Sequence, residues 1–62
     1  MTRKHYRQAA QMLQAVTSSA DRENVAVFLV ALFKADNPRF DVDTFLGAAG
    51  FNVAEFRKET GI

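Results

Sequence analysis

The sequence lacks cysteine and tryptophan altogether, and its 62 residues include one proline and one histidine. Without cysteine the chain can form neither a disulfide nor a thiolate metal site, which fits a reducing cytosol. His5 is a single imidazole and cannot build a metal centre by itself. We therefore expect a domain that uses no metal and no other cofactor.

Long apolar segments and a strong net charge are also missing. The longest uninterrupted apolar run extends only from Val25 to Phe33, about half of the roughly twenty residues that a membrane helix needs. The polar start, Thr2 to Gln8, does not resemble a signal peptide. A net charge of +1 creates no general attraction for a polyanion. We expect one cytoplasmic domain, residues 1–62, with no membrane contact.

The first half of the chain predicts two longer helices. From Thr2 to Ser18, apolar residues recur at intervals of three and four, and Thr2 is a suitable N-cap. From Asp21 to Ala35, with Ser18 or Asp21 as the cap, apolar residues cover nearly every side. This segment also suits a buried strand, but the chain offers no second strand to pair with it. Pro38 ends the second helix because it lacks a backbone donor.

The last third of the chain repeats one motif, F-[DN]-V-x-x-F-x-x-x-x-G, first in Phe40 to Gly50 and again in Phe51 to Gly61. Asp41 and Asn52 stand where an N-cap is needed, and the two phenylalanines of each unit have the spacing of a hydrophobic staple. Each closing glycine suits the left-handed conformation that ends many helices.

The repeat therefore predicts two short helices in a helix-turn-helix-like corner, about Val42 to Ala49 and Val53 to Thr60. Together with the longer helices, the predicted fold class is all-α: a compact bundle of about four helices, two longer followed by two short. The predicted core consists of aromatic and aliphatic residues from all four helices: Tyr6, Ala10, Leu13, Val25, Phe28, Leu29, Leu32, Phe40, Phe45, Leu46, Phe51 and Phe56.

The second helix carries more apolar residues than such small neighbours can cover. A chain of this size has little stability to spare, and excess apolar surface often marks an interface. We expect a homodimer, the commonest symmetric assembly. The candidate interface consists of Val27, Val30, Ala31 and Phe33.

Asp41 and Asp43 are paired carboxylates of the kind used in acid–base catalysis. Both fall in the first turn of a predicted helix, where negative charge offsets the helix dipole, so capping is the preferred interpretation. The glycines are isolated and form no phosphate-binding loop. We therefore expect that the chain is not an enzyme.

Basic residues crowd the start of the first helix, where their charge opposes the dipole and so indicates a partner. The alternative is that these charges are simply solvated at a frayed end. In the last helix, Glu55 and Glu59 dilute the basic charge that a DNA-binding helix would need. The candidate contacts with a nucleic acid or an acidic partner are Arg3, Lys4, Arg7, Arg57 and Lys58.

Two segments, T-R-K-H-Y at Thr2 to Tyr6 and A-D-N-P-R-F-D at Ala35 to Asp41, are followed by Phe45-Leu46 and Ala48-Ala49-Gly50. This pattern resembles a group of small proteins encoded by bacteriophages and prophages, which begin T-R-K-x-[YFH] and carry D-N-P-R-F-D-x-x-x-F-L-x-A-x-G. The chain departs from the pattern by continuing past Gly50. The resemblance implies a phage source and a host-cytoplasmic setting, without a mechanism.

From these observations we expect a small, non-enzymatic, phage-type module that binds a protein partner of the host or the phage. The alternative is a small helix-turn-helix-like regulator that binds nucleic acid.

Overall fold

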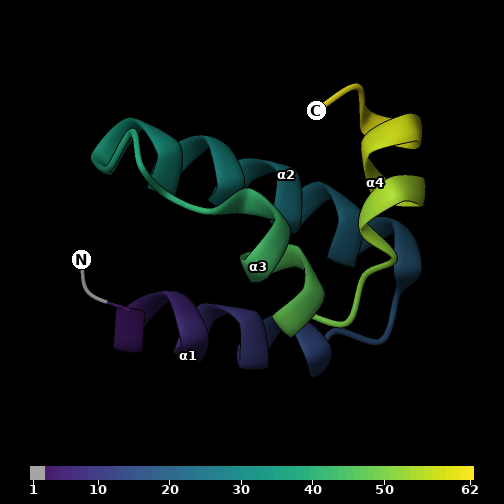
Figure 1. The fold of residues 1–62 in the computed structure, drawn as a ribbon. Coiled ribbons are helices and arrows are strands. Elements are labelled where there is room, and N and C mark those ends of the chain that lie inside the picture. The colour runs from purple at the N-terminus through teal and green to yellow at the C-terminus, as the bar shows by residue number, and fades with distance from the viewer. Residues whose placement is uncertain (1–2) are drawn as a thin grey trace.

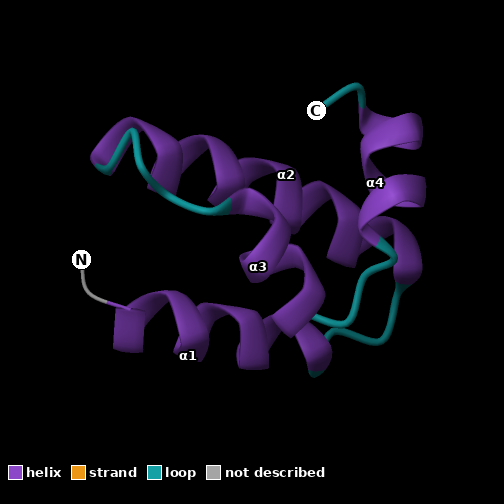
Figure 2. Cartoon of the chain, viewed as in Figure 1, coloured by secondary structure: helices purple, strands orange, loops and turns teal. Residues whose placement is uncertain are grey.

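A computed structural model describes residues 3–62, which form four helices and no strand (Figure 1; Figure 2). The order of two longer and two shorter helices confirms the all-α prediction. The helices are α1 (Arg3–Gln14), α2 (Ser19–Asp36), α3 (Val42–Ala48) and α4 (Val53–Thr60). The predicted cap Thr2 lies outside the described residues.

The break between the first two helices comes earlier than the sequence pattern predicts. α1 ends at Gln14 rather than Ser18, and a tightened turn follows in which the Val16 N–H donates to the Leu13 carbonyl at 3.1 Å. Ser18 instead caps α2, because its hydroxyl accepts from the Asp21 N–H at 3.4 Å. α2 therefore begins at Ser19, ahead of the predicted Asp21.

The repeated motif folds as predicted at both N-termini. The Asp41 carboxylate accepts from the Thr44 N–H, and the Asn52 side-chain oxygen accepts from the Glu55 N–H, each at 3.1 Å. In both units the two phenylalanine rings also meet as staples. Their centroids are 5.5 Å apart for the pair Phe40 and Phe45 and 5.0 Å apart for Phe51 and Phe56.

Gly50 ends α3 in the left-handed conformation, with a φ of 90°. Its N–H donates to the Gly47 carbonyl at 3.1 Å, and the Phe51 N–H donates to the Leu46 carbonyl at 3.0 Å. This pair of bonds is a Schellman motif, which satisfies two carbonyls at the end of the helix. Gly61 closes α4 in the same conformation, with a φ of 74°.

The two longer helices run roughly antiparallel, and α3 lies across the space between them, while α4 stands beside the start of α2 (Figure 1). α3 packs against both α1 and α2, and α4 packs against α3. The core fills the space that these helices enclose. Its buried members are Ala10, Leu13, Ala26, Val30, Phe33, Phe40, Phe45, Leu46, Ala49 and Phe56.

The face of α2 that enters this core is not the predicted one. Val30 and Phe33, predicted as dimer contacts, are only 4% and 3% exposed, so the predicted interface is wrong at both positions. Val27 is half-buried against the core, and Ala31 is exposed. The core prediction is wrong in turn for the residues on the other side of the helix, which are exposed: Val25, Phe28 and Leu32.

The reason lies in the size of the residues at the helix contacts. Ala26 lies on the buried face and is 0% exposed, and a small residue there allows the neighbouring helices to approach α2 closely. Val30 and Phe33 then follow on the same face at helical spacing. Phe28 lies on the opposite side and is 73% exposed. Hydrophobicity alone did not distinguish two faces that are both apolar.

Arg22 joins the C-terminal ends of α1 and α3. Its Nε donates to the Leu13 carbonyl at 3.2 Å, and its Nη2 donates to the Ala49 carbonyl at 2.9 Å. The guanidinium also lies 5.0 Å from the centre of the Phe51 ring, a cation–π distance. A positive charge between two helix C-termini is favoured by both dipoles.

Within residues 3–62, no helix combines the length and the apolar character that crossing a membrane would require.

Gly50→Ala should lower the free energy of unfolding by about 1–2 kcal/mol, because an L side chain is strained in the left-handed region. An added Cβ would also lie 3.3 Å from the Arg22 Nη2. The matched control is Gly47→Ala, where a Cβ meets nothing within 4 Å inside a helix. Urea denaturation should show a loss of stability for Gly50→Ala and none for Gly47→Ala. Equal stability of the two variants would contradict the capping role of Gly50.

Arg22→Met should lower the free energy of unfolding by about 1.5–3 kcal/mol, because it keeps the stem but removes charge-assisted donors from two carbonyls. Lys58→Met, an exposed cation on α4, is the control and should change stability little. Thermal denaturation followed by circular dichroism measures both variants. If Arg22→Met has the same melting temperature as the parent, the hydrogen bonds of Arg22 to α1 and α3 contribute nothing to stability.

Candidate functional site: an arginine-rimmed groove

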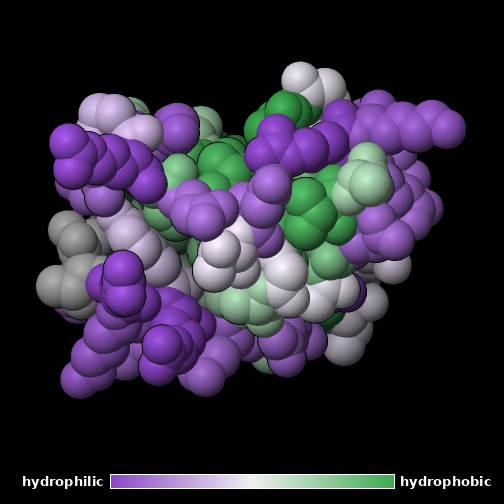
Figure 3. Space-filling model, viewed as in Figure 1, coloured by the Kyte–Doolittle hydropathy of each residue, from purple (hydrophilic) through white to green (hydrophobic). Residues whose placement is uncertain are grey.

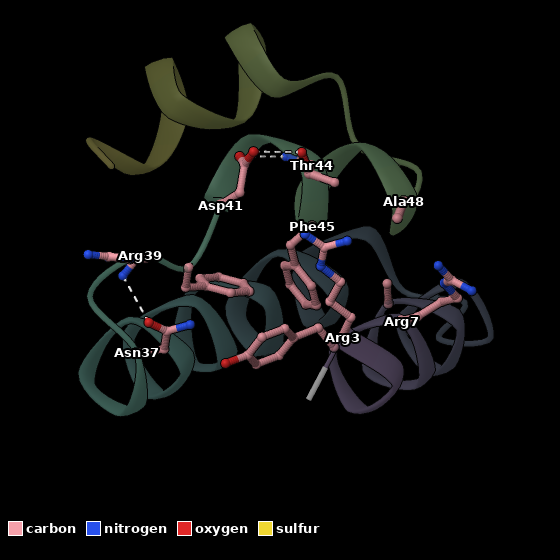
Figure 4. A pocket seen from close by; sticks show the side chains of 11 residues that line it. Arg3, Arg7, Asn37, Arg39, Asp41, Thr44, Phe45 and Ala48 are labelled. Atoms are coloured by element: carbon pink, nitrogen blue, oxygen red, sulfur yellow. Dashed lines mark hydrogen bonds between the residues drawn. The ribbon is translucent and has the colours of Figure 1, made fainter. Parts of the chain in front are cut away.

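An open groove with a volume of about 620 Å³ lies between α1, the turn that precedes α3, and α3 itself (Figure 4). Three arginines, Arg3, Arg7 and Arg39, line it with exposed side chains, and we call it the arginine groove. Beneath them lie two buried rings, Phe40 and Phe45. Cationic groups thus surround an apolar floor.

Local structure explains how the three arginines come to line the same groove. Arg3 and Arg7 stand one turn apart on α1 and therefore share a face. Arg39 follows Pro38 in a turn where the Asn37 side-chain oxygen accepts from the Arg39 N–H at 3.0 Å. The Asn37 carbonyl also accepts from the Phe40 N–H at 2.9 Å, which closes the turn.

The floor belongs to a cluster of four aromatic rings: Tyr6, Phe33, Phe40 and Phe45. The Tyr6 ring centroid lies 4.8 Å from that of Phe33 and 4.8 Å from that of Phe40, and Phe33 lies 5.5 Å from Phe45. Within residues 3–62 the buried Tyr6 hydroxyl has no hydrogen-bond partner. Burying a polar atom without a hydrogen bond normally costs free energy. The Tyr6 side chain borders the arginine groove.

Asp41 adds a carboxylate to the groove, but this carboxylate is already engaged. It accepts from the Thr44 N–H at 3.1 Å and from the Thr44 hydroxyl at 2.8 Å (Figure 4). The backbone N–H of Thr44, and after it the hydroxyl, lower the pKa of Asp41 below the usual 3.8. The groove therefore contains three guanidinium groups and one carboxylate that is committed to capping α3.

The structure brings together only part of the predicted basic set. Arg3 and Arg7 meet at the groove, whereas Lys4 is exposed on α1 and does not line it. Arg39 was missed, because a basic residue in the turn before α3 has no sequence signal that links it to α1. Its position after Asn37-Pro38 indicated a turn but not its neighbours.

Arg57 and Lys58 lie on α4, away from the N-terminal end of α1 (Figure 1). Arg57 forms an ion pair with Asp43, with Nη2 and the carboxylate oxygen 2.5 Å apart, and its Nη1 donates to the Ile62 carbonyl at 2.7 Å. This guanidinium therefore holds α3, α4 and the C-terminal residue together. It is not part of the groove.

The region around α4 also gathers negative charge. Glu23 from α2 borders a small hollow together with Asn52, Glu55 and Glu59. A side-chain hydrogen bond with Glu23, and the negative charge of that residue, raise the pKa of Glu59 above the usual 4.5. The predicted nucleic-acid contacts on α4 are thus mixed with carboxylates that repel phosphate.

The surface reflects this division. Hydrophilic side chains cover the α1 side of the face in Figure 3, whereas hydrophobic atoms gather where α2, α3 and α4 meet.

Comparison of the chain with protein-family models, with curated proteins and with solved structures gave no match.

The lowered pKa of Asp41 predicts a pH dependence of stability. A carboxyl whose pKa is lower in the folded than in the unfolded state stabilises the fold fully above 3.8. This stabilisation is lost as the pH falls through the folded pKa. Asp41→Asn keeps an acceptor for the cap but does not titrate. The melting temperature of the parent should exceed that of Asp41→Asn at neutral pH, and this gap should shrink below pH 3.8. A gap that is constant with pH would contradict the assignment.

Proposed function

We propose that this chain is a small non-enzymatic interaction module whose arginine groove binds an acidic segment of a partner protein. The observation that supports this proposal is that Arg3 and Arg7 from α1 and Arg39 from the turn before α3 line one groove. Three cationic side chains around one groove attract an anionic partner.

The chemistry of the groove suits an anionic ligand such as a carboxylate. A guanidinium presents a planar fork of donors that matches a carboxylate, and both groups form short charge-assisted bonds. A volume of about 620 Å³ is in the range of pockets that hold a few side chains.

Nucleic acid fits the same surface less well. Phe40 and Phe45 are only 5% and 4% exposed, so neither ring has a free face on which a base could stack. On α4, Glu55 and Glu59 oppose the phosphate contacts that a helix-turn-helix reader makes. These observations favour an acidic protein segment over the nucleic-acid alternative.

A non-enzymatic role is supported by the positions of the paired carboxylates. Asp41 caps α3, and Asp43 is held by Arg57, so each has a structural partner. The setting that we propose is the cytoplasm of a host cell, as the resemblance to phage and prophage proteins implies.

The charge of the groove can be tested with a fluorescein-labelled peptide in which four glutamates flank one leucine. Fluorescence anisotropy should show binding at low salt that weakens at 300 mM NaCl, because the contacts are charge pairs near the surface. The double substitution Arg7→Glu and Arg39→Glu should reduce the affinity at least tenfold, since it replaces two attractive charges with repulsive ones.

The matched control is Lys58→Glu, which makes the same kind of charge change on α4, away from the groove, and should leave the peptide affinity within twofold. A labelled duplex DNA of mixed sequence is titrated in parallel. The proposal is wrong if the DNA binds more tightly than the peptide, or if Lys58→Glu weakens peptide binding as much as the groove variant does.

A further inference from the structure

The side of α2 that faces away from the core is apolar along most of its length. It presents five residues, which we call the outer face of α2: Val25, Phe28, Ala31, Leu32 and Ala35. The Phe28 ring is 73% exposed, and Leu32 and Val25 are 48% and 44% exposed. An exposed apolar stripe of this extent is typical of an interaction surface.

We propose that the outer face of α2 binds the same face of a second copy of the chain, with the two helices antiparallel. This pairing would remove the exposed Phe28, Leu32 and Val25 side chains from water, which is the driving force for the contact.

The outer face is complementary to itself in shape. Phe28 is a large projecting ring, whereas Ala31 and Ala35, one and two turns further along the same face, leave shallow space. When two copies of the face pack antiparallel, Phe28 of each lies beside Ala31 of the other, and Val25 lies beside Ala35. Such an isologous contact closes on itself as a dimer.

Charge also favours a second copy over another partner. No charged residue stands between Glu23 and Lys34, so a charged peptide would find no counter-charge along the centre of the face. Glu23 borders Glu59 of α4, and Lys34 donates to the Phe40 carbonyl at 3.4 Å, so both of these charges have partners away from the outer face. An antiparallel pair also opposes the two helix dipoles, which favours this orientation over a parallel one.

The dimer leaves both arginine grooves open. The buried face of α2 meets α1 and α3, which form the groove, so the outer face lies on the other side of the helix. Two grooves in one dimer would bind a partner with repeated acidic segments more tightly than one groove does. The dimer itself does not depend on what the grooves bind.

Sedimentation equilibrium from 10 µM to 1 mM tests the proposal. The parent should change from monomer to dimer over this range, and its melting temperature should rise with concentration. Phe28→Glu should remain monomeric at 1 mM with unchanged helicity, a loss of association of at least tenfold. Met12→Glu is the matched control, because Met12 on α1 is also 73% exposed but lies off the outer face. It should dimerise as the parent does.

A parent that stays monomeric at 1 mM would overturn the proposal, as would equal dissociation by Phe28→Glu and Met12→Glu. If Phe28→Glu loses helicity, Leu32→Gln repeats the test on the same face.

Discussion

Tyr6, Phe33, Phe40 and Phe45 come from α1, α2, the following turn and α3, and neighbouring rings in this cluster lie 4.8 to 5.5 Å apart. A chain of this size buries few large side chains, so the tilted and edge-on contacts of these rings supply much of what joins the three helices. The same rings underlie the arginine groove. The candidate site is therefore located by the core, and a change in the aromatic cluster would alter both stability and the shape of the groove.

At the other end of the helix pair, the connection is polar. Arg22 donates to the last carbonyls of α1 and α3, and Gln14 donates to the Ala48 carbonyl at 2.6 Å. Helix C-termini present carbonyls without intrahelical partners, and these donors satisfy some of them. α1 contributes few large apolar residues at this end, so hydrogen bonds replace the packing that it lacks. Arg22 consequently has a structural role and is not available to a ligand.

Two surfaces with different chemistry lie on different sides of α2. The arginine groove is cationic, concave and built from segments far apart in the sequence, which suits an acidic segment of a partner. The outer face of α2 is apolar, continuous and free of charge at its centre, which suits another copy of itself. An apolar helix within so small a domain can be covered by its neighbours on only one side, so the other side of α2 stays exposed.

Local interactions determined what the sequence could predict. The caps at Asp41 and Asn52, the staples and the glycines act within a few residues, so the order of the helices and both ends of α4 followed from the pattern alone. The buried face of α2 and the placement of Arg3 and Arg39 along one groove were decided by tertiary structure. Both faces of α2 are apolar, so the pattern alone could not show that the side with Ala26, Val30 and Phe33 is the buried one. The groove likewise joins residues whose proximity depends on the packing of α3 between α1 and α2, a relation that no local pattern encodes.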